Sequence, residues 1–270
     1  MSSDDARVQE MIARACFGRR DEADFRSDLR AFLVQHGVPD RDVDAICASP
    51  PRLGLYRRLI RNNVIGVTER MLARTRARMN ELDGLFDATL DAWLDEVGPR
   101  THHLRDVPHE LLAWAAPRWS ARSDVAPWLV DLARHELVEW AVSAAEGSAD
   151  VAVGEVALDR PVVLAEALRL DRYAFAVHEL PADVEDRSTP RASPTALLAY
   201  RDADHAVRFL ELGALAAAIV EGAIAGATLG DAVTGACAAL GTRASPSVLD
   251  DVARLLETLG SRGILRGGKV

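Results

Sequence analysis

The sequence predicts an α+β protein: an all-helical N-terminal domain followed by a winged-helix-like C-terminal domain with a small antiparallel sheet. Apolar residues recur at helical spacing through residues 1–147, whereas short apolar runs separated by turn residues follow from residue 148. Near the C-terminus, a hairpin pattern runs directly into three short helical patterns. That order of elements is typical of a winged-helix unit. We therefore place the two domains at residues 1–147 and 148–270.

The hairpin is predicted from two apolar runs that flank a turn rich in aspartate. Residues 196–200 form the first run, residues 201–204 the turn, and residues 205–210 the second run. An earlier region, residues 162–177, has the same character, with two strand-like runs around an expected turn at residues 170–172. A last short run, residues 263–266, is expected to close the sheet.

Three helices are predicted after the hairpin. The first covers residues 213–225 and ends at a glycine. The second starts at Thr228, with Asp231 three residues later in a capping-box-like arrangement. The third starts with Ser245 as N-cap and Pro246 at the first helical position, where proline is well tolerated.

The N-terminal half is predicted to be helical throughout, and it contains all five tryptophans, which we expect to anchor a helical bundle. A boundary to the second domain is expected at residues 147–150, which are small and polar. The helical stripes cover residues 8–16, 25–33, 53–79, 82–97, 107–119 and 125–146.

Composition excludes several classes of function. No apolar run reaches 18 residues, so no membrane span is expected, and the acidic start lacks the apolar region of a secretory signal. We therefore expect a cytoplasmic protein. The net charge of −9 argues against general nucleic-acid binding, which needs a basic footprint.

The charge is nevertheless uneven. Between Arg52 and Arg78 the chain has eight arginines and one acidic residue. Arg57, Arg58 and Arg61 are the candidates for a side that faces a partner or DNA. An ordinary solvated face, or a face that pairs with an acidic protein surface, explains the same pattern and is favoured over DNA.

No catalytic or metal centre emerges from the sequence. His102, His103, His109 and His135 match no zinc spacing, and position 139, where H-E-x-x-H requires its second histidine, is a glutamate. Neither a nucleophile elbow nor a glycine-rich phosphate loop is present. We therefore predict a protein that is not an enzyme and needs no metal or cofactor of its own.

Two stretches resemble known families. Residues 197–212, 214–219, 228–231 and 255–259 resemble a PqqD-type recognition element, a winged-helix module that binds precursor peptides of ribosomal natural products. Residues 55–57, Asn62-Asn63, 86–93, 111–114 and 127–136 follow one another at spacings similar to those of HvfC/BufC-type proteins, whose N-terminal domain is often named for DNA binding. Residues 73–78 depart from that pattern, because they lack the Phe-Pro pair common in the family.

The resemblance implies a partner role. HvfC/BufC-type proteins accompany multinuclear non-haem iron oxidative enzymes, and the partner presents a precursor peptide to the enzyme. We therefore predict a non-catalytic partner protein that binds a precursor (leader) peptide for an iron-dependent peptide-modifying enzyme. The alternative is a winged-helix transcription regulator, although the acidic third helix argues against DNA binding.

The peptide site is expected at an exposed strand edge beside the third helix. A peptide can add to such an edge as an extra strand, with alternate side chains supplying selectivity. For the three leucines of the helix, a plain core role is the more probable alternative. The candidate residues are His205, Val207, Phe209 and Leu210 on the strand, and Val252, Leu255, Leu256 and Leu259 on the helix.

Overall fold

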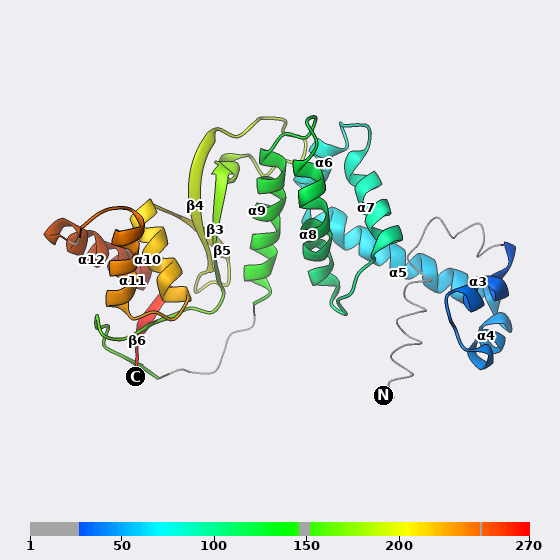
Figure 1. Ribbon diagram of the computed structural model, residues 1–270, viewed down its shortest axis with the longest axis horizontal. Helices are drawn as coiled ribbons and strands as arrows, with labels where there is room; N and C mark the ends of the chain where they lie inside the picture. The colour runs from blue at the N-terminus through cyan, green and yellow to red at the C-terminus, as the bar shows by residue number, and fades with distance from the viewer. Residues whose placement is uncertain (1–26, 146–151, 244) are drawn as a thin grey trace. The chain divides into compact units, whose positions relative to one another are not determined.

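The computed structural model describes residues 27–145, 152–243 and 245–270, apart from the side chains of residues 50–53 (Figure 1). It confirms the α+β class, with helices first and small antiparallel sheets and helices after them. The chain divides into two compact units. Unit 1 comprises Met1–Ala133 with Ala182–Arg187, and unit 2 comprises Arg134–Pro181 with Ser188–Val270. The expected boundary at residues 147–150 and the stripe at residues 8–16 lie outside the described residues.

Unit 1 is helical in its described part. Trp93, Phe86 and Trp119 are fully buried in it, and the Trp119 Nε1–H donates to the Thr89 hydroxyl at 3.1 Å. The tryptophans at 93 and 119 thus anchor the bundle as predicted. Its helices are α3 (Leu29–Gln35), α4 (Asp40–Cys47), α5 (Pro50–Met71), α6 (Ala73–Met79), α7 (Leu85–Glu96), the 3₁₀ turn η1 (Leu104–Asp106), α8 (Val107–Ser120) and the start of α9 (Trp128–Ser143).

The single long helix expected at residues 53–79 is in fact two helices. Leu72 separates α5 from α6, with φ −121° and ψ 35°, which are not helical dihedral angles. Its side chain is completely buried. The apolar pattern continues through Leu72 without interruption, but tertiary packing breaks the helix there. Helical periodicity in the sequence does not reveal such a break.

A short segment from the second half of the chain belongs to unit 1. The Arg78 guanidinium, which is buried, forms an ion pair with Asp186 at 3.2 Å and lies 6.0 Å from the Trp128 ring. Next to it, Arg187 pairs with Glu81. These two ion pairs hold this polar segment against the helices of unit 1.

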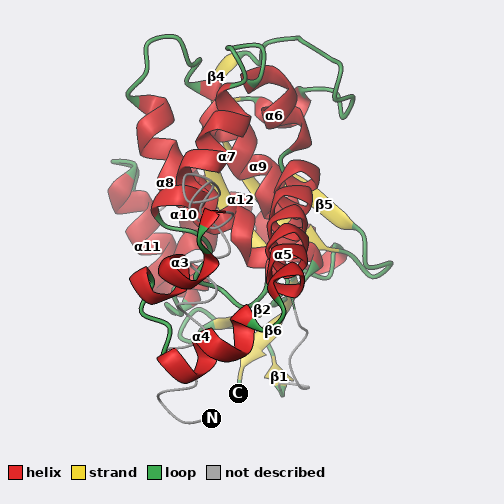
Figure 2. Ribbon diagram, turned by 90° about the vertical axis from the view of Figure 1, so that its right-hand side faces the viewer, coloured by secondary structure: helices red, strands yellow, loops and turns green. Residues whose placement is uncertain are grey.

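Unit 2 contains two three-stranded antiparallel sheets (Figure 2). The larger has the order β3-β4-β5 and the smaller the order β1-β6-β2. The predicted hairpin is confirmed as β4 and β5, in the register Arg201 opposite Val207 to Ala196 opposite Leu212. The strands are β1 (Val153–Gly154), β2 (Val162–Leu164), β3 (Leu168–Phe175), β4 (Ala192–Arg201), β5 (Val207–Leu212) and β6 (Leu265–Lys269).

Two strand predictions are wrong. Residues 170–172, expected to form a turn, lie inside β3, because the Asp171 carboxylate pairs with Arg134 at 3.4 Å and Arg172 pairs with Glu221 at 2.8 Å. The final run does not close the hairpin sheet. It forms β6, which pairs with β1 and β2.

The small sheet depends on a close backbone approach at Gly268. A Cβ atom added there would lie 2.2 Å from the Glu155 backbone oxygen, so no other residue fits without displacing that strand connection. Glycine is therefore required here because the neighbouring backbone leaves no room for a side chain. A left-handed backbone conformation is not the reason.

Helices α10 (Ala214–Ile224), α11 (Leu229–Ala239) and α12 (Pro246–Ser261) follow the hairpin as predicted. The Thr228 hydroxyl accepts from the Asp231 N–H at 3.1 Å, and the Ser245 hydroxyl accepts from the Val248 N–H at 3.4 Å, so both predicted N-caps are confirmed. These helices and one face of the sheet share a core that includes Leu198, Leu212, Ala217 and Leu259.

The other face of the β3-β4-β5 sheet is covered by the C-terminal half of α9. Val138 and Val142 of this helix pack against Ala199, Val207 and Phe209. The sheet is therefore buried on both faces, and its remaining exposure is at the edges. No helix in the described part of the chain is long and apolar enough to cross a membrane.

Candidate functional site

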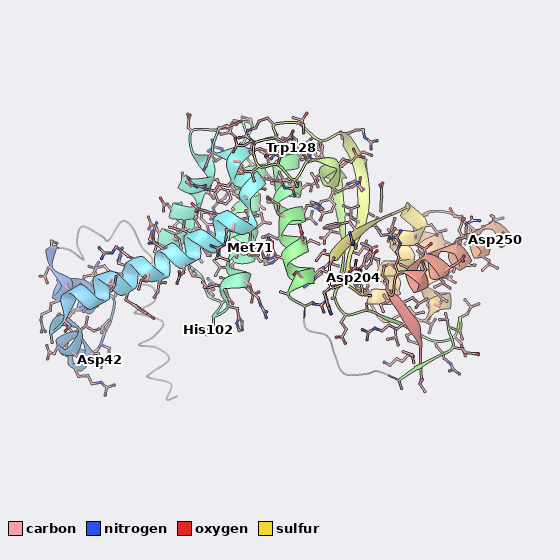
Figure 3. All side chains as sticks on the ribbon, turned by 180° about the vertical axis from the view of Figure 1, so that it is seen from behind. Asp42, Met71, His102, Trp128, Asp204 and Asp250 are labelled. Atoms are coloured by element: carbon pink, nitrogen blue, oxygen red, sulfur yellow. The ribbon has the colours of Figure 1, made fainter. Side chains whose placement is uncertain are left out.

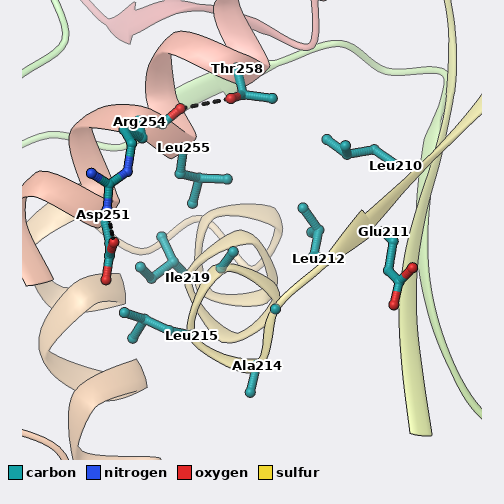
Figure 4. A pocket seen from close by; sticks show the side chains of 12 residues that line it. Leu210, Glu211, Leu212, Ala214, Leu215, Ile219, Asp251, Arg254, Leu255 and Thr258 are labelled. Atoms are coloured by element: carbon teal, nitrogen blue, oxygen red, sulfur yellow. Dashed lines mark hydrogen bonds and ion pairs between the residues drawn. The ribbon is translucent and has the colours of Figure 1, made fainter. Parts of the chain in front are cut away.

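A groove of about 410 Å³ lies between β5, the start of α10 and α12 (Figure 4). Its floor is apolar and its rim is polar. Leu210 and Leu212 come from the strand and Leu255 from α12, so two elements of the predicted site meet here. The floor is completed by Leu215 and Ile219 of α10, and the polar rim is formed by Asp251, Arg254 and Thr258 of α12.

The strand that borders the groove is the edge strand of its sheet. Of the described residues, only those of β4 pair with β5 in the sheet. The Asp202 N–H donates to the Ala206 oxygen at 2.9 Å, and the Arg201 N–H donates away from β5, to Ala167, at 3.1 Å. Antiparallel ladders alternate, so the backbone groups of Val207, Phe209 and Glu211 face the outer edge. This edge can accept another strand.

The side chains of β5 point alternately to two faces. Leu210 and Leu212 point toward the groove, whereas Glu211 points away from them (Figure 4). Val207 and Phe209 share the face of Glu211 and pack toward α9, where the Phe209 ring centroid lies 4.7 Å from that of His135. The side chains of an added strand would therefore point alternately to two surfaces. One is the apolar groove, and the other is the face of the sheet that carries Val207, Phe209 and Glu211.

His205 lies in the turn before β5 and is not part of the strand, so this boundary prediction is wrong. Its φ of 62° is left-handed, and its N–H donates to the Asp202 oxygen at 3.0 Å. The Asp202 carboxylate accepts from the Asp204 N–H at 3.0 Å, the Ala206 N–H at 2.9 Å and the Arg208 guanidinium at 2.7 Å. Asp204 marks this turn in Figure 3.

The Asp202 carboxylate makes the hairpin sensitive to acid. Its hydrogen bonds to the Arg208 guanidinium and then to the Ala206 N–H lower the pKa of the Asp202 carboxyl below its usual value. A lowered folded-state pKa stabilises the hairpin above the unfolded pKa of about 3.9, and this contribution is lost as the pH falls through the folded-state value. The turn holds β5 in register, so this residue supports the edge.

We predict that Asp202→Ala increases amide hydrogen exchange across β5 at neutral pH. Asp202→Asn should have a smaller effect, since it retains an oxygen that accepts from the Ala206 N–H. Acidification below the ordinary carboxyl pKa should lower the protection factors of the β5 amides, which are corrected for the intrinsic exchange rate at each pH, in the wild-type chain, and should lower them less in Asp202→Ala. Identical acid sensitivity in the two proteins would show that another group controls the turn.

The predicted α12 residues divide between groove and core. Leu255 lines the groove, whereas Val252 and Leu259 are buried in the core and Leu256 is half-buried against it. The core alternative, which the sequence raised for the three leucines, therefore describes Leu259 and Leu256, and Val252 lies in the same core. Leu255 has both roles, because it belongs to the core and also reaches the groove.

The two acidic residues next to the groove, Asp251 and Glu211, differ in how tightly their carboxylates are already paired. Asp251 pairs with Arg254 on α12, and the Thr258 hydroxyl donates to the Arg254 oxygen at 2.8 Å. The Glu211 carboxylate has His178 Nε2 at 3.8 Å, and 63% of its side chain is exposed. The Glu211 carboxylate, which points away from the groove, is thus less tightly paired than that of Asp251.

The three arginines predicted to face a partner are placed differently from one another. Arg57 is only 6% exposed, and its guanidinium lies 6.0 Å from the Phe32 ring. Arg61 pairs with Asp91 of α7. Arg58 is exposed. A continuous stripe of three exposed arginines is therefore not present on α5.

Sequence reasoning missed much of the groove. Leu212 lay beyond the second apolar run predicted at residues 205–210, and Leu215 and Ile219 were assigned only to a helix. Their spacing of four residues places both on one side of α10, a signal that was available but pointed equally to the core. The pairing of Asp251 with Arg254 also follows helical spacing.

The histidines form no shared site in the described structure. Residues 102 and 103 lie in an exposed connection, whereas His135 is buried beside Tyr173 and Phe209. No group of three or more His, Cys, Asp or Glu side chains suited to a metal ion occurs among the described residues.

The sequence of unit 2 matches a known family. Residues 164–260, from the end of β2 through most of α12, match the family model for the HvfC C-terminal domain. This part of the chain is therefore similar to the HvfC C-terminal domain. The match contains the whole hairpin, α10, α11 and every groove residue, so the groove lies inside the region that is similar to this family. No curated protein matches the chain.

Proposed function

We propose that this chain is a non-catalytic partner protein that binds a precursor peptide as an additional strand on β5. The observation that carries the proposal is the outer edge of β5, which runs beside an apolar groove within the region similar to the HvfC C-terminal domain. Unpaired backbone groups would supply affinity, and the groove would take alternate side chains of the peptide. Val207, Phe209 and Leu210 supply the edge, and Leu255 supplies the facing wall.

The bound peptide would be presented to a multinuclear non-haem iron oxidative enzyme. The similarity to the HvfC C-terminal domain supports this partner class, and the helical unit 1 is the proposed docking element for the enzyme. Holding the peptide near the enzyme raises its effective concentration and converts an encounter between separate molecules into a local one. In this mechanism the residues of this chain bind and orient, and the chemistry belongs to the enzyme.

The test begins with a tagged pulldown from nuclease-treated native lysate, followed by mass spectrometry of large proteins and short peptides. We expect an iron-containing oxidative enzyme and a short peptide. The purified enzyme should then modify that peptide poorly alone and faster by on the order of tenfold or more with this chain, because binding raises the effective concentration of the peptide. Equal rates with and without the chain would refute the partner role.

A transcription regulator is the less favoured function. Asp250, Asp251 and Glu257 are exposed on α12, and phosphate would repel them. Asp250 is labelled on this helix in Figure 3. Arg254 is already paired with Asp251. DNA retained in a parallel lysate without nuclease, with affinity that falls steeply with salt, would be the result that favours the regulator.

A further inference from the structure

Glu211 distinguishes the two faces of the open edge by charge. Its carboxylate lies on the face opposite Leu210 and Leu212, and it is exposed. In the register of the sheet, Glu211 lies opposite Leu197, which lies opposite Asp171 of β3. The next place in this row is empty in the described structure, and a strand added to β5 would fill it.

The surroundings leave the Glu211 carboxylate available. His178 of the 3₁₀ turn η2 (Val177–Glu179) is the partner given to it by the described residues, at 3.8 Å, which is longer than a hydrogen bond. The Asp171 carboxylate of the same row is paired with Arg134. On the opposite face, Asp251 is paired with Arg254. A basic side chain on the added strand, opposite Glu211, would therefore pair with a carboxylate that no strand neighbour in the described structure neutralises.

We infer that the peptide bound on β5 carries an apolar–basic–apolar segment, with its lysine or arginine opposite Glu211. The two apolar side chains enter the groove beside Leu210 and Leu212, because neighbours in a strand point to opposite faces. The basic side chain then lies on the other face, within reach of the Glu211 carboxylate as a cross-strand pair. This inference rests on the proposed strand addition and specifies which peptides satisfy it.

Exposed cross-strand pairs are individually weak, so the expected preference is modest. Replacing the basic residue by glutamate removes one attraction and adds one repulsion. The two effects together predict a difference of roughly two- to tenfold in affinity. The preference should shrink as salt is added, since the pair is exposed.

The test uses two short synthetic peptides labelled with fluorescein, with Leu-Lys-Leu or Leu-Glu-Leu at the centre and threonines on both sides. Fluorescence polarisation with the full chain should show tighter binding of the lysine peptide. Glu211→Lys should reverse the preference, and Glu211→Gln should abolish it. Thermal unfolding of each variant establishes that the chain is folded.

Glu257→Lys is the matched control, because it makes the same charge change on α12 at an exposed position outside the groove. It should keep the preference for the lysine peptide. An unchanged preference in Glu211→Lys, or binding of neither peptide, would overturn the inference. If the peptide from the pulldown binds at the edge without any charge preference, the inference fails while the proposed function stands. If that peptide does not bind β5, both fail.

Discussion

Glu211→Pro should weaken binding of the pulldown peptide on the order of tenfold or more. The Glu211 N–H faces the outer edge of β5, so proline removes one donor that the added strand would use and places its ring where that strand would lie. One hydrogen bond contributes about 0.5–1.5 kcal/mol, and the steric conflict adds to this loss. The fold should tolerate the change, since proline is accepted on edge strands where the N–H faces solvent.

Glu211→Ala is the control for this substitution. It removes the same carboxylate but keeps the backbone N–H, so its loss of affinity should stay within the few-fold range of one exposed charge pair. Isothermal titration calorimetry on both variants separates the contribution of the Glu211 backbone N–H to peptide affinity from that of its carboxylate. Equal losses in the two variants would mean that the backbone edge plays no part in binding.

Gly222→Val should lower the free energy of unfolding of unit 2 by about 1–3 kcal/mol. Gly222 lies where α10 meets α11, and a Cβ atom there would lie 2.9 Å from the Ala232 Cβ and 3.1 Å from its Cα. The nearest atoms belong to the backbone or are attached directly to it, so they cannot rotate away. The two helices must separate, which disturbs the core below the groove.

Gly235→Ala is the matched control on α11. Nothing lies within 4 Å of an added Cβ at Gly235, so alanine gains helix propensity without a clash. It should stabilise the protein by about 0.5–1 kcal/mol, opposite in sign to Gly222→Val. Denaturant unfolding followed by circular dichroism measures both. A destabilised Gly235→Ala variant would contradict the spatial explanation.

Local signals in the sequence predicted local structure well. Ser245 and Thr228 cap their helices as expected, because a hydroxyl that satisfies a free N–H acts within one turn of chain. The hairpin was also predicted, since two apolar runs around an aspartate turn are close in sequence. His205 was misplaced because its left-handed φ depends on the Asp202 hydrogen bonds.

The errors arise from interactions distant in sequence. Asp171 and Arg172 were predicted to form a turn because they are charged and lie between two apolar runs. Their ion-pair partners, Arg134 and Glu221, are far away along the chain, so the local sequence does not reveal them. Arg57 read as exposed because its contact with Phe32 leaves no periodic signal. The β6 strand likewise pairs with β1 and β2, more than a hundred residues earlier.

Half of the candidate site was therefore predictable. The hairpin pattern identified the edge strand, and helical spacing placed Leu255 on α12. The floor contributed by Leu215 and Ile219 was not, because apolar residues on a short helix have the same pattern in a core and in a groove. The available charge of Glu211 became visible only once Asp251 was seen to pair with Arg254.

Residue-resolved amide hydrogen exchange, with and without the pulldown peptide, tests the central claim most directly. Strand addition predicts new protection at Val207, Phe209 and Glu211, whose N–H groups face the outer edge. Arg208, Leu210 and Leu212, which are bonded to β4, should already be protected and should change little. Protection that appears elsewhere while these alternate amides remain unchanged would contradict peptide binding on β5.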